Sequence, residues 1–424
     1  MGKIIVKRHL HVEQPGVLEE AMVTSVGYVS KDRNVLMECV QYGGQRGFYF
    51  CVHGQAGQYE ARHVVRRSED NGRTWTKVED LARFRPIEGR RRLEVWEPNF
   101  VVHPKSGALM RVYQTNEDLD GVLAWDKASP VPRTGRVWTQ VSVDEGKTWS
   151  ETEQVIVQGG EYDATHWAPG VWYDTNSGGV EGFVPVWTTE EEFVVPFVCQ
   201  PRRGPDDTQR ARSHSGCLIG RWRAGETKVS WSIPSLATVG PAYSNCGADE
   251  PSVALLPDGR LAMTLRVRVD PNDGTTLPSG KFIATSRDLG RTWDEPQPLK
   301  YTDGEQVYCP ACLANVFVSS RNRRVYLVTN ILDRPTHGCD PRTSLQIAEL
   351  DPGTLRVIRD SVTVIETRRP DQLETIRFSN WRWYEDRKTK NIVLLMTGCP
   401  GNQGRHETCR VPPHSYRYDL ILPD

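Results

Sequence analysis

The stretch from Ser68 to Trp75, SEDNGRTW, occurs two more times with small changes, as SVDEGKTW from Ser142 to Trp149 and as SRDLGRTW from Ser286 to Trp293. All three fit the pattern S-x-D-x-G-x-T-W, which fixes five of eight positions. A pattern this long, written three times, indicates an internal repeat. A repeat of this kind determines the architecture before single residues are considered.

The spacing of the three boxes gives the length of the repeating unit. Asp70 and Asp144 lie 74 residues apart, and Asp144 and Asp288 lie 144 residues apart, which is two steps of 72. At the intermediate place the chain reads CLIGRWRAGETKVSW (217–231), which keeps a strand, a glycine turn and a tryptophan but has lost the aspartate. Six units of this length account for the 424 residues.

Each unit consists of short stretches rich in Val, Ile, Tyr and Trp that are separated by Gly, Asn and Asp turns, and helical periodicity is nearly absent. Units of several short strands repeated around an axis are typical of β-propellers. The sequence therefore predicts an all-β fold, a six-bladed β-propeller with four-stranded antiparallel blades, in one domain spanning 1–424. We expect KIIVKRHLHV at the start to pair with SYRYDLILP at the end as a closing strand.

Within each box the residue types explain the turn. The aspartate carboxylate can accept hydrogen bonds from backbone N–H groups of the turn and from the threonine hydroxyl, the glycine can adopt a positive φ, and the tryptophan can pack between sheets. We therefore predict a structural role for Asp70, Asp144 and Asp288.

Charge and composition limit the classes of binding partner that we expect. The 53 Lys and Arg residues almost cancel the 54 Asp and Glu residues, which gives no reason to expect nucleic acid or a membrane surface as a partner. The sequence contains neither an apolar run long enough to span a membrane nor an N-terminal signal segment. We expect a cytoplasmic protein, or a secreted or periplasmic one whose leader has been removed, and leave its oligomeric state open.

The ten cysteines are too dilute for a disulfide scaffold. Cys309 and Cys312 have the spacing of a redox or metal motif, but no second CxxC or HxxxH lies nearby to complete a zinc site. We expect these thiols to be structural, and we expect neither a metal nor a cofactor.

With its surroundings the repeat resembles a known family. VVRRSEDNGRTW, EPSVALLPDGRLAMTLR and FIATSRDLGRTW follow one another as in blades of the sialidase (neuraminidase) superfamily, whose Asp-boxes are also called BNR repeats. The resemblance covers most of the chain. It implies the propeller fold and a carbohydrate ligand, although such boxes also occur in binding proteins, other glycosidases and lyases.

The resemblance also assigns residues. Glu250 matches the family's glutamate that assists a tyrosine nucleophile. Arg266, with Arg268 as its neighbouring alternative, and Arg342 match arginines that bind the substrate carboxylate. Planar guanidinium groups bind carboxylates through two parallel hydrogen bonds, which suits an anionic sugar.

Four positions depart from the family pattern. Glu20 stands where a substrate-binding arginine is expected, Phe378 stands in place of the nucleophilic tyrosine, and Glu97 stands in place of an asparagine. The loop from Gly43 to Glu60 lacks the family's acidic aspartate. Because phenylalanine cannot act as a nucleophile, we do not expect a standard tyrosine-dependent sialidase.

Aligned inner strands place three carboxylates at the mouth of the expected funnel. Glu97 and Glu250 each precede a proline at the same place in the repeat, and Glu20 begins a third inner strand. Two carboxylates that flank a glycosidic oxygen, one protonated and one ionised, are the minimum for glycoside hydrolysis. We predict Glu97 and Glu250 as the catalytic pair, with Glu20 as a third catalytic candidate.

Further candidates lie beside these positions. His166 can serve as a general base or hold a substrate hydroxyl, or it can simply be packed and hydrogen-bonded. Arg382 can reach the funnel or pair with Glu385 and Asp386. The remaining substrate-binding candidates are Asp163 and the indoles of Trp96, Trp167, Trp381 and Trp383, which can stack on sugar rings or belong to the core.

The polar segment 188–216 is long for a connection between strands, and we expect a loop on the pocket side of the third blade that contributes Arg210 or Arg212. A solvated loop is the alternative.

These observations favour an exo-acting, sialidase-like glycoside hydrolase that releases a terminal, acidic sugar without a cofactor. Two alternatives remain open. One is a polysaccharide lyase acting on a uronate-containing glycan, in which His166 or a tyrosine removes the proton. The other is a propeller that binds glycans without cleaving them.

Overall fold

The structure is a computed structural model, and it describes residues 2–13, 20–43, 62–82, 84–88, 91–96, 98–119, 134–180, 184–204, 212–270, 274–400 and 410–424. Glu97, Arg210 and most of the loop from Gly43 to Glu60, which contains no aspartate, lie outside these residues.

The described strands form six antiparallel sheets. The first contains β2 (Glu20–Tyr28), β3 (Leu36–Gly43), β4 (Arg62–Ser68) and β5 (Thr76–Ala82). The second contains β6 (Phe84–Pro86), β7 (Arg91–Val95), β8 (Asn99–Val102), β9 (Leu109–Leu119), β10 (Thr134–Ser142) and β11 (Glu153–Gln154). The third contains β12 (Gly178–Gly179), β13 (Val186–Trp187), β14 (Glu192–Cys199), β15 (His214–Arg221), β16 (Ser230–Ser232) and β17 (Leu236–Ala237).

The remaining three sheets are four-stranded. The fourth contains β18 (Ala248–Leu255), β19 (Leu261–Val267), β20 (Gly280–Ser286) and β21 (Gln297–Pro298). The fifth contains β22 (Asn315–Val318), β23 (Val325–Thr329), β24 (Ser344–Leu350) and β25 (Thr363–Thr367). The sixth contains β26 (Arg382–Glu385), β27 (Ile392–Thr397), β28 (Ser415–Ile421) and β1 (Ile5–Val12).

The fold is a six-bladed β-propeller, as the repeat predicted. No α-helix occurs among the described residues, and no helix in that part of the chain has the length and apolar character needed to cross a membrane. The chain divides into two compact units, one of residues 1–12, 212–217 and 234–424, and the other of residues 13–211 and 218–233.

In the first of these units the sheets pack face to face through apolar side chains. Ala254 and Ala262 of the fourth sheet share a core with Leu327 of the fifth. Tyr326 and Leu394 belong to a second core, which the fifth and sixth sheets share. The fourth and sixth sheets cover the two faces of β23. Every residue of β23 and of β27 is buried, which agrees with their largely apolar sequences.

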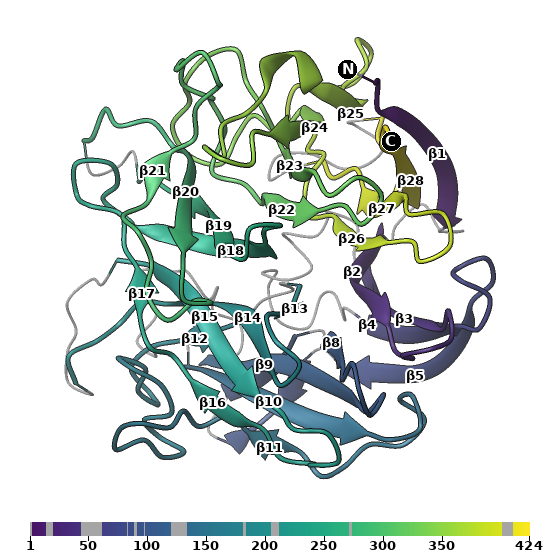
Figure 1. Cartoon of the computed structure of the whole chain (residues 1–424), viewed down its shortest axis with the longest axis vertical. Coiled ribbons are helices and arrows are strands. Elements are labelled where there is room, and N and C mark those ends of the chain that lie inside the picture. Colours follow the sequence, from purple (N-terminus) through teal and green to yellow (C-terminus); the bar gives the residue numbers. More distant parts are fainter. Residues whose placement is uncertain are drawn as a thin grey trace. The chain divides into compact units, whose positions relative to one another are not determined.

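The two ends of the chain meet in the sixth sheet. The N-terminal strand β1 pairs antiparallel with the C-terminal strand β28, from Ile5 opposite Ile421 to Leu10 opposite Tyr416, and Figure 1 shows the two strands side by side. This confirms the predicted closing strand. β1 is thereby the fourth strand of its blade and covers the hydrogen-bonding edge of β28.

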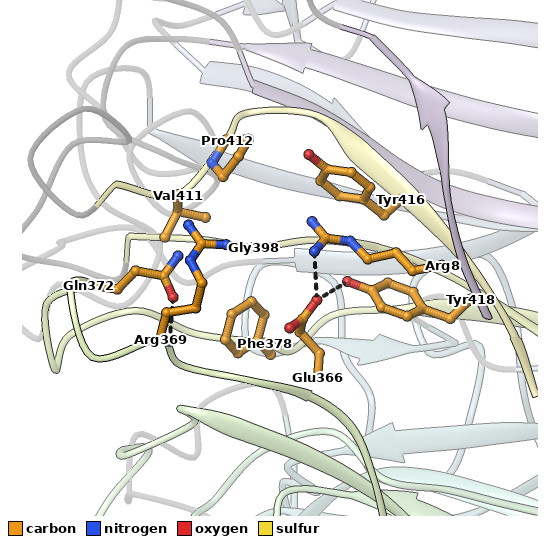
Figure 2. Close-up of a pocket in the computed structure, with 10 residues that line it drawn as sticks. All are labelled: Arg8, Glu366, Arg369, Gln372, Phe378, Gly398, Val411, Pro412, Tyr416 and Tyr418. Carbon is orange, nitrogen blue, oxygen red and sulfur yellow. Dashed lines mark hydrogen bonds and ion pairs between the residues drawn. The ribbon is translucent and has the colours of Figure 1, made fainter. Parts of the chain in front are cut away.

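Side chains also tie the closing strand to the neighbouring sheet (Figure 2). Glu366 on β25 accepts a hydrogen bond from the hydroxyl of Tyr418 at 2.8 Å and forms an ion pair with Arg8 at 3.2 Å. The Arg8 guanidinium lies over the ring of Tyr416, 3.7 Å from its centroid. Burial and the charge of Glu366 raise the pKa of Tyr418, so its hydroxyl remains a donor. The hollow between these residues has room for about one water molecule.

The three Asp-containing turns each connect the last two strands of a sheet in chain order: β4 to β5, β10 to β11, and β20 to β21. In the first turn Asp70 accepts hydrogen bonds from the backbone N–H of Thr74 at 2.9 Å and from its hydroxyl at 2.7 Å. Asp144 and Asp288 repeat both bonds with Thr148 and Thr292. The turn glycines have positive φ, as expected.

The segment 188–216 differs from the expected loop. Residues Glu192–Cys199 form β14, a mostly buried strand of the third sheet, and β15 begins at His214. The apolar run FVVPFV within this polar stretch explains the strand, because its side chains pack in the core. Residues 205–211 lie outside the described part of the chain.

We predict that deletion of residues 1–12 lowers the melting temperature of the whole protein. The deletion would expose the edge of β28 and remove Arg8 from Glu366. Tyr418→Phe is the matched small change. It removes one donor from Glu366 and should cost about 1 kcal/mol. Thermal and denaturant unfolding would measure both, and an unchanged melting temperature after the deletion would contradict the closing role of β1.

A second prediction concerns pH and Asp288. The side-chain and backbone hydrogen bonds from Thr292 lower the pKa of Asp288 to about 2, whereas an unfolded chain has an aspartate pKa of about 3.9. The stability from this lowered pKa is therefore fully present above about pH 4 and is lost as the pH falls toward 2. Relative to the parent, Asp288→Asn should be less stable at pH 6, and this deficit should shrink near pH 2. Thr292→Val should reduce the same pH dependence. A deficit independent of pH would contradict the assignment.

Candidate functional site

Glu250 occupies a distorted position at the start of β18. The pairing of β18 with β19 is interrupted by a register shift between Asp249 and Ser252, and Glu250 itself has a φ of 44°. A non-glycine residue in this region is strained, and such strain persists where the surroundings fix it, often at functional sites. The bulge redirects the Glu250 side chain, which remains 28% exposed.

Two arginines, one on β19 and one just after it, accompany Glu250. Arg266 of β19 forms an ion pair and hydrogen bond with Glu250, and its Nε lies 3.6 Å from the Asp249 carboxylate. Arg268, the first residue after β19, has its Nε 3.9 Å from Asp249. The Arg266 guanidinium also lies 3.3 Å from the sulfur of Cys339. The structure thus brings together three of the predicted site residues: Glu250, Arg266 and Arg268.

Arg342 belongs to the same cluster but is only 2% exposed. Its Nε donates to the carbonyl of Cys339 at 2.7 Å, its Nη1 to the hydroxyl of Ser379 at 3.1 Å, and its Nη2 to the carbonyl of Ala311 at 2.9 Å. These bonds connect three segments of the chain. All three guanidinium nitrogens of Arg342 therefore have protein acceptors, and none is directed to solvent.

The cluster keeps Glu250 ionised. Burial alone would raise the pKa of Glu250, but the positive charges of Arg266, Arg342 and Lys281 together hold it below its usual value. Lys281 was not among the residues singled out from the sequence.

Some buried polar atoms of this cluster have no hydrogen-bond partner within the described residues. They include Oε2 of Glu250 and Oδ1 of Asp249. Buried polar atoms in native proteins are almost always satisfied by protein, water or ligand. An ionised carboxylate with one uncommitted oxygen can accept a proton or attack an electrophilic carbon.

The second unit holds the candidates Glu20, Trp96, Asp163, His166 and Trp167. Glu20, the first residue of β2, is 3% exposed. Asp163 accepts hydrogen bonds from the backbone of Thr165 at 2.7 Å and of His166 at 2.8 Å. The bond from the His166 backbone, and after it the bonds from the hydroxyl and backbone of Thr165, lower the pKa of Asp163. Asp163 therefore fixes the loop that presents His166.

The His166 ring stacks on Trp172, with centroids 3.7 Å apart and planes 5° apart, and it meets the edge of Tyr162. Trp167, by contrast, is 1% exposed, packs against Phe197, and donates from Nε1 to the carbonyl of Gly135 at 3.0 Å. Trp167 thus offers no open ring face to a sugar. The partly exposed rings between positions 162 and 173 are those of Tyr162, His166, Trp172 and Tyr173.

The other predicted residues lie as follows. Trp96 is partly buried just before β8. Arg382 begins β26 and donates to the carbonyl of Trp381 at 3.1 Å. Trp381 is buried, and Trp383 packs against the core of the fifth and sixth sheets. Arg212 donates to the carbonyl of Ser244 at 2.6 Å.

Cys309 and Cys312 are free thiols and fully buried. Burial raises the pKa of Cys309 to about 12, so this thiol is not a nucleophile near neutral pH. No cluster of three or more His, Cys, Asp or Glu side chains that could hold a metal ion occurs in the described part of the chain.

Comparisons with known proteins agree with this fold. No protein-family model and no curated protein sequence matches the chain. Among solved structures, a protein of unknown function from Dyadobacter fermentans DSM 18053 matches with a TM-score of 0.60 at 14% identity, over 99% of both chains. The intramolecular trans-sialidase from Ruminococcus gnavus matches with a TM-score of 0.54 at 12% identity, over 95% of this chain and 96% of that one.

The GH93 α-L-arabinofuranosidase of Fusarium graminearum matches with a TM-score of 0.53 at 13% identity, over 99% of this chain and 98% of that one. The protein therefore has the sialidase-type six-bladed β-propeller fold, which the sequence repeat had indicated. Identities this low establish the fold, and the chemistry has to be argued from the residues.

We predict that Arg342→Met and Arg268→Met differ sharply in stability. Arg342→Met would leave two carbonyls and a hydroxyl without their buried donor, and we expect a loss of about 3 kcal/mol or more. Arg268 has a side chain that is 39% exposed, and we expect its replacement to change stability by about 0.5 kcal/mol or less. Denaturant unfolding would measure both. Equal losses would contradict the structural role of Arg342.

Proposed function

We propose that this protein is an exo-acting glycoside hydrolase that removes a terminal acidic sugar, with Glu250 as the ionised carboxylate of the reaction and Glu97 as the proton donor. The observation that supports this best is the Glu250 cluster, in which a partly exposed carboxylate on a strained backbone is held ionised by Arg266 and by the buried Arg342 and Lys281. Structural similarity to sialidases and to an arabinofuranosidase supports a carbohydrate substrate.

The charge of the cluster supports an anionic substrate. Four cationic side chains, Arg266, Arg268, Arg342 and Lys281, accompany the carboxylates of Asp249 and Glu250. A carboxylate on the sugar would offset part of this positive excess. Arg268 is the arginine best placed to bind it, because its side chain is 39% exposed and, within the described residues, its ion pair is a long one, 3.9 Å from Asp249.

The ionisation of Glu250 assigns its part in the mechanism. Hydrolysis needs one carboxyl group that gives a proton to the leaving oxygen and one carboxylate that acts as nucleophile or base. Because Glu250 is the ionised member, the proton has to come from another group, and we assign this role to Glu97. With Phe378 in place of the tyrosine nucleophile, Glu250 would attack the anomeric carbon itself or remove a proton from water. Retention or inversion of the product would tell these two apart.

The test is incubation with sialosides, uronate-containing oligosaccharides and arabino- and rhamno-oligosaccharides, with products read by mass and ultraviolet absorbance. We expect a product that has gained one water. Glu250→Gln and Glu97→Gln should each lower turnover about 10²- to 10⁴-fold, whereas Glu295→Gln, at an exposed position, should leave it unchanged.

Two other outcomes would contradict the proposal. An unsaturated product that absorbs in the ultraviolet would identify a lyase. Saturable binding of a sugar with no product after long incubation would identify a binding protein.

A further inference from the structure

Lys281 is a fully buried lysine, with 0% of its surface exposed. It lies near the start of β20, directly opposite Arg266 on β19, and Arg266 in turn lies opposite Asp249 on β18. Residues directly opposite one another in antiparallel strands have their side chains on the same face of the sheet. Asp249, Arg266 and Lys281 therefore form one row of charges across the fourth sheet.

The direct contacts of Lys281 do not compensate its charge. Its Nζ donates to the carbonyl of Cys312, and among the described residues no carboxylate comes within salt-bridge distance of it. Burying an ammonium group is costly unless an opposite charge stabilises it. The buried lysine thus needs an electrostatic partner within the cluster. Glu250 pairs with Arg266, which lies directly opposite Lys281, and it is the carboxylate whose ionisation Lys281 favours.

The charged and titratable groups near Glu250 come from several segments of the chain. Asp249 lies on its own strand, Arg266 on β19, Arg268 just after β19, and Lys281 on β20, while Arg342 and Cys339 come from the segment that precedes β24. Lys281 bonds to the carbonyl of Cys312, and its charge also acts on Cys309. Of the cations, Arg266 and Arg268 are partly exposed, and Lys281 and Arg342 are buried.

We propose that Lys281 is a positioning residue that acts as the fixed buried counter-charge of Glu250 and keeps this carboxylate ionised when a substrate occupies the partly exposed arginines. An anionic group bound to Arg266 or Arg268 would weaken their hold on Glu250. Lys281, sealed behind them, would not contact the substrate, so its charge would act on Glu250 throughout the reaction. The catalytic consequence rests on the proposed function, whereas the coupling between the two residues does not.

The sign of the effect follows from the direction of the Glu250 pKa. A carboxylate whose pKa is lowered by folding contributes stability above its unfolded pKa, about 4.3, and loses it as the pH falls through the folded value. Without Lys281, burial of Glu250 would be less well offset and its pKa would rise. Lys281→Met should therefore be most destabilising at neutral pH, and its deficit relative to the parent should shrink on acidification, as the Glu250 carboxyl takes up a proton.

The experiment is a set of melting curves at pH 7 and pH 4 for the full chain, Lys281→Met, Glu250→Gln and the double variant. We expect the loss of melting temperature in Lys281→Met to be larger at pH 7 than at pH 4. In the Glu250→Gln background the Lys281→Met change should cost less, and its cost should not depend on pH. A cost that is the same at both pH values and in both backgrounds would overturn the proposal and leave Lys281 as a packing residue.

Two outcomes for the double variant keep the test decisive. If Lys281→Met alone does not fold at pH 7, the double variant, which removes both charges, should regain a cooperative transition there. If the double variant also fails to fold while Glu250→Gln folds, the proposal is overturned. These readouts need no substrate, so they stand whether or not the hydrolase assignment holds.

Once a substrate is cleaved, the acid limb of kcat/KM should move up by about one pH unit in Lys281→Met. Lys281→Arg, which keeps the charge, should return the limb toward that of the parent. An unmoved limb in Lys281→Met would count against the proposal even if Glu250 proves to be catalytic.

Discussion

The pairing of the first strand with the last is the constraint on which the sixth blade depends. Without β1, the C-terminal strand β28 would have an open hydrogen-bonding edge. Open edges invite association with other chains. Here β1 completes the blade. The ion pair and hydrogen bond that join Arg8 and Tyr418 to Glu366 add a link to the next sheet (Figure 2). The ends of the chain are thereby held by both backbone and side chains.

Glu250 illustrates how a regular repeated fold can contain a candidate site at one irregular position. The other residues of β18 follow regular pairing with β19, but the register shift and the positive φ at Glu250 break the ladder at this one place. The strained backbone is held by its surroundings: Arg266 binds the carboxylate, and Arg342 ties together segments around it. Backbone strain and buried charge both lower stability, and proteins tend to retain these features where function requires them.

The sequence predicted the fold well because the repeated residues themselves form the hydrogen bonds of a turn. Each S-x-D-x-G-x-T-W box lies at an equivalent turn between two strands. It also predicted that Glu250 and Arg266 belong together. It did not single out Lys281, whose place opposite Arg266 depends on the register of a hairpin with a long connection. Nor could it show that Trp167 packs inward, because the pattern HWAPGVW allows either of its indoles to face solvent. Burial depends on neighbouring sheets, which local sequence does not specify.

The departures from the sialidase pattern fit together when the charges are considered jointly. With phenylalanine at position 378, the hydroxyl that a neighbouring glutamate would activate is absent, so a catalytic Glu250 has to react as a carboxylate. Such a carboxyl group has to be ionised before it reacts. Buried cations stabilise its ionised form most steadily, because water and salt screen them least. In the proposed enzyme the partly exposed Arg268 would then be free to bind the substrate, while Lys281 and Arg342 maintain the charge of the reacting group.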